Sequence, residues 1–210
     1  MRKAVDYLMI AALIFLTGSG TATNKTESLL HEICGITLFV CVALHLILNR
    51  KWFTKLFKGK YSGNRIALTV TDVLLIVTVI LIIVSSVVVS RYIFSFLGAK
   101  GALLARRIHL VVTAWMLVIC GIHYGLHLKK EWWNYILYAF GAGGIAAIVY
   151  CKFYERLFLI SEFAYTPRSP QWLMYLLYAL IFLTFVTLGS LLKRFFLYKR
   201  KSQQDAAEYL

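Results

Sequence analysis

The stretch LLHEICGITLFVCVALHLILN, residues 29–49, decides the fold class. It contains no Lys or Arg and a single acidic residue, Glu32. As a helix it can cross the hydrocarbon core of a bilayer, which is about 30 Å thick and needs about 20 apolar residues. A transmembrane β-strand would instead alternate apolar and polar residues over about 10 positions. The stretch therefore predicts a membrane-spanning helix.

The composition of the whole chain extends this interpretation. Of the 210 residues, 60% are hydrophobic and 15% are charged, and the mean hydropathy is +0.74. Soluble domains have about 45–50% apolar and about 25% charged residues, so these values exclude an ordinary soluble globule. The apolar runs predict an all-α integral membrane protein with six transmembrane helices, at about residues 4–21, 29–49, 66–94, 107–128, 132–151 and 172–192.

The charge of the chain predicts its orientation. The formal net charge is +14, from 23 Lys and Arg against 9 Asp and Glu. Because the basic residues lie between apolar runs, the positive-inside rule explains them better than a nucleic-acid surface does, and we expect no nucleic-acid partner. Most of them lie on one side if the N-terminus is inside. We therefore expect a multi-pass protein of the cytoplasmic membrane, in contact with its lipid, with both termini in the cytoplasm.

The first 22 residues also have the pattern of a signal peptide. A basic start precedes an apolar run at 4–16, and small residues follow at 20–22. Cleavage there would leave five spans and an external N-terminus. The helical bundle that the histidines indicate needs this first span, so we expect it to be retained.

All five histidines lie in two of the predicted spans, His31 and His45 in the second and His109, His123 and His127 in the fourth. Ionisable groups inside a membrane are costly and usually face a bundle interior or a pathway. The distance from His31 to His45 is 14 residues, as is that from His109 to His123. At about 100° per residue, each pair returns to within about 40° of one direction, with its members about 21 Å apart along the helix axis.

The two histidine-bearing spans run in the same direction, because one span separates them. His31 and His109 then lie at the outer depth of the membrane, and His45 and His123 at the inner depth. Two facing imidazoles can hold a haem iron from both sides, with no open position, which suits electron transfer. The spacing therefore predicts these four histidines as axial ligands of two b-type haems. The haems would be non-covalent, because no C-x-x-C-H motif is present.

The histidines and a nearby acid also allow different roles. Each histidine is alternatively a buried side chain that bonds to a neighbouring helix, whereas a zinc site is disfavoured because the paired histidines are too far apart. His127 lies four residues after His123 on nearly the same face. It is either the alternative inner ligand or an interfacial residue near the haem propionates or a quinone. Asp72 is either a proton relay for a quinol or a first-turn acid favoured by the helix dipole.

At these residues the chain resembles the flavinylation-associated cytochromes, which are bacterial membrane proteins with two bis-histidine haems. The stretches that carry the resemblance are residues 29–52 and RRIHLVVTAWMLVICGIHYGLHL (106–128) within a matching region of about 4–130. The resemblance implies a four-helix haem bundle whose second and fourth helices supply the ligands. It also implies electron transfer from quinol or the cytoplasmic side to an outside acceptor, often a protein that carries covalent FMN.

Small and basic residues near the histidines fit a haem site. Gly35 and Gly121 would leave room for the edge of a haem, although glycines also serve as helix contacts. Arg106 and Arg107 precede His109, and Arg50 follows His45. Their charges suit the anionic propionates, although snorkelling to the membrane surface is the alternative.

The expected organisation has three parts. Residues 1–130 form the di-haem bundle, residues 131–198 add two spans with an outer loop at 152–171, and residues 199–210 form a short cytoplasmic tail that is frayed. The first twelve residues of the loop would make an amphipathic interfacial helix. The predicted function is transmembrane electron transfer, with a quinone as a further ligand. The alternatives are the cytochrome b anchor subunit of a respiratory dehydrogenase or reductase and, in another class, a haem-free transporter.

Overall fold

The computed structural model describes residues 2–19, 24–59, 61–97, 102–128, 134–160, 167 and 169–208, and within them it contains helices and no strands. The helices are α1 (Arg2–Gly18), α2 (Lys25–Leu48), α3 (Lys51–Lys55), α4 (Gly63–Val89), the short 3-10 turn η1 (Ser95–Leu97), α5 (Ala102–His127), α6 (Asn134–Tyr150), α7 (Phe153–Leu157) and α8 (Gln171–Glu208). The all-α fold class is confirmed. The predicted cleavage site at 20–22 and the loop residues 161–166 lie outside the described residues.

Four described helices are long and apolar enough to cross a membrane: α2, α4, α5 and α8. The protein therefore has the helices of a multi-pass membrane protein. The other two predicted spans correspond to α1 and α6, each with 17 helical residues. At about 1.5 Å per residue, such a helix is about 25 Å long, short of the ~30 Å core. Crossing of the membrane by α1 and α6 stays a prediction.

Local interactions move the ends of two helices from their predicted positions. α2 begins earlier than expected because Asn24 caps it: the backbone N–H of Glu27 donates to the Asn24 side chain over 2.9 Å. α4 ends at Val89, five residues before the predicted end at 94. There the side chain of Ser90 accepts the backbone N–H of Phe94 and the chain turns out of the helix.

Two predictions for the second half of the chain are wrong. The interfacial helix expected after residue 151 is only α7, whose Phe153 and Arg156 are buried in the protein instead of lying on its surface. The tail expected to fray from residue 199 continues α8 as helix to Glu208. Gln, Ala, Lys and Glu dominate that tail, and their helix propensity favours the continuation of the helix.

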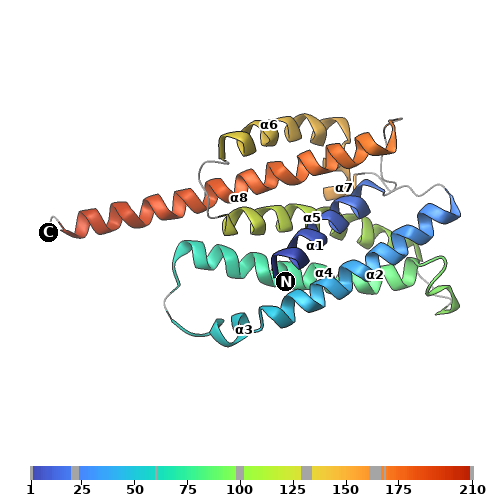
Figure 1. Ribbon diagram of the computed structural model, residues 1–210, viewed down its shortest axis with the longest axis horizontal. Helices are drawn as coiled ribbons and strands as arrows, with labels where there is room; N and C mark the ends of the chain where they lie inside the picture. The colour runs from blue at the N-terminus through green and yellow to red at the C-terminus, as the bar shows by residue number, and fades with distance from the viewer. Residues whose placement is uncertain are drawn as a thin grey trace.

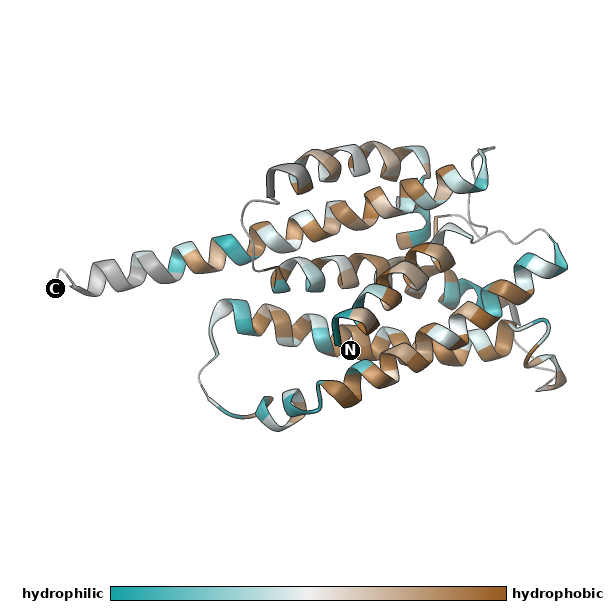
Figure 2. Cartoon of the chain, in the orientation of Figure 1, coloured by the Kyte–Doolittle hydropathy of each residue, from teal (hydrophilic) through white to brown (hydrophobic). Residues whose placement is uncertain are grey.

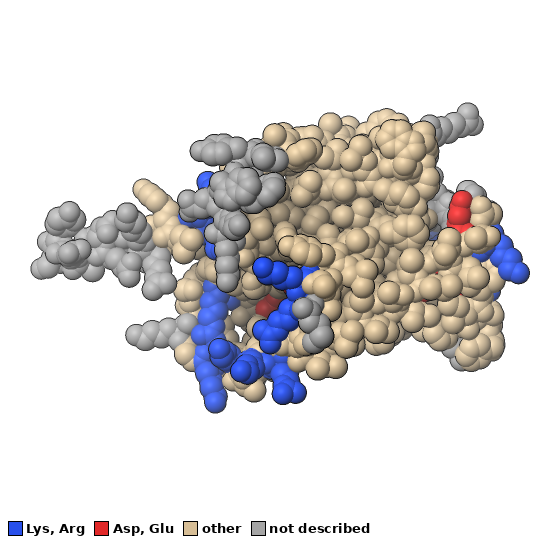
Figure 3. Space-filling view, viewed as in Figure 1, with Lys and Arg blue, Asp and Glu red and all other residues tan. Residues whose placement is uncertain are grey.

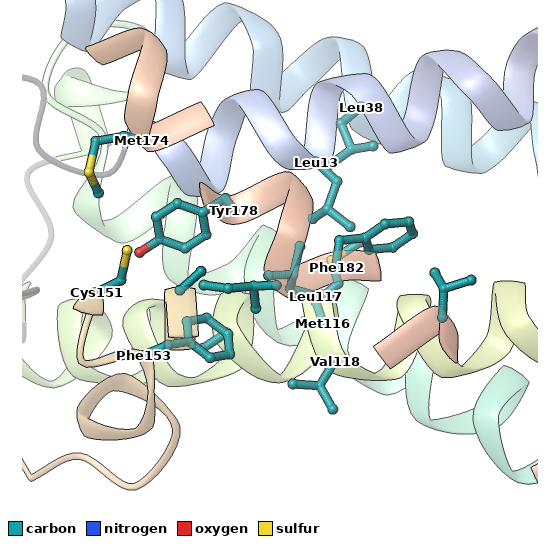
Figure 4. Packing of buried hydrophobic residues seen from close by; sticks show 14 residues of the cluster. Leu13, Leu38, Met116, Leu117, Val118, Cys151, Phe153, Met174, Tyr178 and Phe182 are labelled. Atoms are coloured by element: carbon teal, nitrogen blue, oxygen red, sulfur yellow. The ribbon is translucent and has the colours of Figure 1, made fainter. Parts of the chain in front are cut away.

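Figure 1 shows the long helices side by side in an elongated bundle, with α2 and α5 running in the same direction as predicted. One side of the bundle is tightly packed: α8 lies against both α5 and α6. A Cβ on Gly125 or Gly189 would collide with the backbone of the partner helix, so these glycines let α5 and α8 touch. Figure 4 shows the apolar side chains that fill this part of the core, among them Phe153, Tyr178 and Phe182.

The other side of the bundle is more open. α2 packs along α1 but has no extensive packing against α4 or α5 among the described elements. Figure 2 shows apolar residues covering the bodies of the helices. Many of these on α2 are exposed to the surroundings and provide a surface for lipid: Leu30, Ile33, Ile36, Phe39, Val40, Leu44 and Ile47. Because α2 packs mainly on α1, it lies apart from α4 and α5 along most of its length.

Candidate functional site

A cavity of about 790 Å³ lies inside the bundle, lined by α1, α2, α4 and α5 together with Arg156 of α7 and part of the segment 90–94. Its size falls in the range of about 300–1,000 Å³ found for ligand sites. The lining is mostly apolar, with a few polar groups at the end where α2 begins and α4 ends. The four helices around the cavity are those that the sequence predicts as the haem bundle.

His31 and His109 face each other in this cavity from two helices that have no extensive packing against each other. Both line it, and the centroids of their rings are 6.5 Å apart. An imidazole nitrogen lies about 2 Å from the metal that it binds, so two imidazoles on opposite sides of one iron have centroids about 6 Å apart. The outer pair predicted from the 14-residue spacing is thus brought together at a distance that suits one shared metal.

A serine hydroxyl lies beside one ring nitrogen of His31. Its Nδ1 lies 3.2 Å from the Oγ of Ser19. That hydroxyl also lies 3.3 Å from the carbonyl of Leu16, and when it donates there it accepts a hydrogen bond from Nδ1–H of the imidazole. In that arrangement the proton of the neutral ring is on Nδ1 and the lone pair on Nε2. This is the tautomer of a metal-binding histidine that is oriented by a second group.

His109 is oriented in the same way from another helix. Its Nδ1 lies 3.3 Å from the hydroxyls of Ser85 and Ser86 on α4. Ser85 donates to the carbonyl of Leu81 over 2.7 Å, which leaves its oxygen able to accept from Nδ1–H, whereas the hydroxyl of Ser86 can either donate or accept. Both outer histidines therefore have a hydroxyl beside Nδ1, and with the proton on Nδ1 each presents the lone pair of Nε2.

At the other end of the bundle, His45 and His123 each meet a carboxylate. The Nδ1 of His45 lies 2.8 Å from Oδ1 of Asp6 on α1, and the Nδ1 of His123 lies 2.9 Å from Oδ1 of Asp72 on α4. The second pair has the distance of a hydrogen bond but not its angle. A carboxylate on Nδ1 is a common support of a metal-binding imidazole, because it holds the ring and leaves Nε2 for the metal.

The inner pair is less completely assembled than the outer pair. The described ring contacts include none between His45 and His123; instead the rings of His123 and His127 are 4.7 Å apart. His127 is the last residue of α5 and is exposed. Among the described residues, the carboxylates of Asp6 and Asp72 pair with the other two histidines and not with His127. Its role and the inner pairing stay predictions.

The first-turn role predicted for Asp72 is wrong. α4 begins at Gly63, so Asp72 lies in the third turn of the helix, where the dipole of the helix start no longer favours an acid. Its carboxylate lies beside His123 instead. Asp72 is therefore placed to orient that imidazole.

Glu32, which follows His31, ties α2 to the chain beyond α4. Its carboxylate accepts the hydroxyl of Ser90 over 2.8 Å and the backbone N–H groups of Arg91 and Ile93 over 2.7 and 2.8 Å. Because α2 packs little against α4, this contact links the two helices at the mouth of the cavity. It helps to hold His31 at its distance from His109.

The two glycines predicted beside the haems have different surroundings in the structure. Gly35 lines the cavity, and a Cβ placed on it would meet nothing within 4 Å, so this glycine faces open space. A Cβ on Gly121 would lie 2.7 Å from Cβ of Phe185 on α8. The prediction that Gly121 makes room for a haem is therefore wrong, and this glycine serves the contact between α5 and α8.

The three predicted arginines also differ in whether they line the cavity. Arg106 lines the cavity. Arg107 lies on the same helix but is not among the lining residues, and Arg50 is exposed in the turn between α2 and α3, so neither faces this cavity. Cavity-lining Arg156 was not predicted at all, because it lies in a segment that the sequence indicated as a surface loop.

The histidines suit a metal that already has most of its ligands from a bound molecule. Among the described residues, no three His, Cys, Asp or Glu side chains gather in a group that would hold a bare metal ion. They form pairs of imidazoles instead. A porphyrin supplies four nitrogens to its iron and needs only the two axial ligands. The four cysteines are free, and Cys41 and Cys151 are buried, as expected for packing residues.

Comparisons with known proteins add no relative: no protein family, no curated protein and no solved structure matches this chain.

Proposed function

We propose that this protein is a transmembrane cytochrome b that carries electrons across the membrane through two bis-histidine haems. The observation that carries the proposal is that Nδ1 of each histidine predicted as a ligand lies within 3.3 Å of a serine hydroxyl or a carboxylate oxygen, which is where a second residue orients a metal-binding imidazole. His31 and His109 also face each other across a cavity large enough for a ligand. Four histidines buried only for packing would not need the same orientation.

His31 and His109 would hold the outer haem, and His45 and His123 the inner haem. Haem with two imidazole ligands supplies one-electron transfer without a free position for oxygen or substrate. The 14-residue spacing separates the two levels by about 21 Å, a large part of the ~30 Å core. The residues of this chain would orient the imidazoles, through Ser19, Ser85, Asp6 and Asp72, and keep water out with apolar helices.

The proposal includes six spans, with α1 and α6 crossing beside the four longer helices. Figure 3 shows Lys and Arg gathered mainly at the end of the bundle that carries α3. By the positive-inside rule, this end is cytoplasmic, so both termini are inside and His31 and His109 lie near the outer face. Electrons would then pass from quinol, or from another donor at the cytoplasmic side, to an outside acceptor such as an FMN-carrying protein.

Filling the space beside Gly35 tests the haem site with a matched control. Gly35→Leu places a side chain into the cavity, so we expect the haem content to fall from two per chain towards one. Gly143→Leu is the control, because a Cβ at Gly143 also meets nothing within 4 Å but this glycine is exposed on α6. That variant should keep both haems. Haem per purified chain, measured as the pyridine haemochrome, is the readout.

The same pair of variants tests electron transfer. In liposomes that contain trapped ferricyanide, with dithionite outside, the wild type and Gly143→Leu should reduce the ferricyanide, and Gly35→Leu should be slower by about tenfold or more because one of the two centres is missing. Equal haem content and equal rates in all three proteins would contradict the assignment of this cavity.

A further inference from the structure

Arg156 of α7 is a buried cation in the wall of the cavity. Its side chain belongs to a residue that is only 7% exposed, and it lines the cavity with His31 and His109. Its charge acts on both imidazoles. A buried guanidinium is costly unless an anion or several acceptors compensate it.

The described residues do not compensate this charge. Nη1 donates to the hydroxyl of Tyr178 over 2.6 Å, and the guanidinium carbon lies 5.6 Å from the centroid of the same ring. Tyr178 is neutral, and it is fixed in the apolar core (Figure 4). Nε of Arg156 is buried without a partner among the described residues. The neighbouring acid, Glu155, pairs with Lys152 over 3.5 Å instead.

Further cations and an acid that already has partners complete the arrangement. Arg106 and the exposed Arg91 also line the cavity, so three arginines contribute to its wall. The acid that lines the cavity, Glu32, is already bonded to Ser90 and to backbone N–H groups of the segment 91–93. The cavity therefore has an excess of positive charge beside its two imidazoles.

We propose that Arg156, assisted by Arg106, binds a carboxylate of the ligand in this cavity. This inference rests on the proposed function, in which the ligand is haem and the carboxylate is a propionate. Arginine is suited to this contact because its planar group gives two parallel hydrogen bonds to a carboxylate. Tyr178 holds the guanidinium through Nη1, so the group is fixed in the wall of the cavity. A segment outside residues 1–130 thus completes the outer haem site.

Arg156→Gln tests this contact by removing the charge. The purified full-length protein is mixed with excess apomyoglobin, and haem transfer is followed by absorbance. In the wild type we expect two slow phases. In Arg156→Gln one phase should become about tenfold faster or more, because charge-assisted hydrogen bonds are lost. Lys152→Gln is the matched control: it removes a cation from the same segment whose ion pair is at the surface. It should leave both phases unchanged.

Haem dimethyl ester tests whether the partner is a propionate. Protein made without haem is reconstituted with haem or with its ester, whose propionates carry no charge. The wild type and Arg156→Lys should bind the ester at one site about tenfold more weakly than haem, whereas Arg156→Gln should bind the two about equally. The retained cation in Arg156→Lys separates this effect from loss of folding.

Two results would overturn the inference alone: a wild type with two haems whose loss is unchanged in Arg156→Gln, or an ester that is equally weakened in all variants. A wild type that binds no haem would overturn the proposed function itself.

Discussion

Replacing His31 with alanine is expected to reduce the haem content from two per chain to one. His109→Ala should give the same loss, because the two imidazoles lie 6.5 Å apart across one cavity and would share one iron. The haem that remains should keep the low-spin spectrum of two imidazole ligands, since His45 and His123 are about 21 Å away along their helices. Pyridine haemochrome assays and reduced-minus-oxidised spectra of the purified variants provide the measurement.

Cys34→Ala is the control for this prediction. Cys34 lies three residues after His31 on α2, carries a free thiol and is not among the residues that line the cavity. This variant should keep both haems. If His31→Ala and His109→Ala retained two haems, or if only one of them lost haem, the two histidines would not share an iron.

The second large effect is expected from histidine variants at the inner haem. His123→Ala should lose the inner haem, whereas His127→Ala should keep both. His123 has a carboxylate 2.9 Å from its Nδ1, as His45 does at 2.8 Å, and a carboxylate in this position would support a metal-binding imidazole. His127 is exposed at the end of α5 and lies about 6 Å deeper along the helix than His123. Haem content and low-spin spectra of the two single variants, measured side by side, test this assignment.

The opposite pattern would reverse the assignment. If His127→Ala lost the inner haem and His123→Ala kept it, His127 would be the ligand and His123 the residue that supports it. The 4.7 Å between the rings of these two histidines makes this comparison sharp, because both variants change the same place in the protein.

The features that could be predicted from the sequence are those that depend on one helix alone, such as which residues share a face and how far apart they lie along the axis. A spacing of 14 residues places His31 and His45 on one face, and His109 and His123 on another. The order of the spans makes the two helices parallel. Spacing and order together were sufficient to bring His31 and His109 to one cavity. The long apolar runs similarly predict α2, α4, α5 and the membrane part of α8.

Contacts between helices could not be predicted in this way. Asp6 reaches His45 across 39 positions, and Ser85 reaches His109 across 24. Asp6 lies within the first predicted span, where an acid needs a partner, but the sequence does not identify that partner. Arg156 was missed because its segment, rich in charged and aromatic residues, is typical of a membrane surface. Its burial depends on how α7 packs against α5 and α6.

Gly121 shows the limit of residue type as a guide to function. Its position two residues before His123 suggested room for a haem, but a small residue on a membrane helix also permits close contact with another helix. Only the position of α8, whose Phe185 and Phe182 face this glycine, decides between these two roles. Gly35 is a glycine near a histidine in the same way, and it faces the cavity.

The haem content of the purified wild-type protein tests the central claim most directly. Produced in cells supplied with haem, the full-length chain should be red, with a low-spin b-type spectrum and two haems per chain by pyridine haemochrome. Acidified acetone should extract all of the haem, because no C-x-x-C-H motif is present to bind it covalently. A folded but colourless protein from such cells would contradict the proposed function and leave a haem-free membrane protein, such as a transporter.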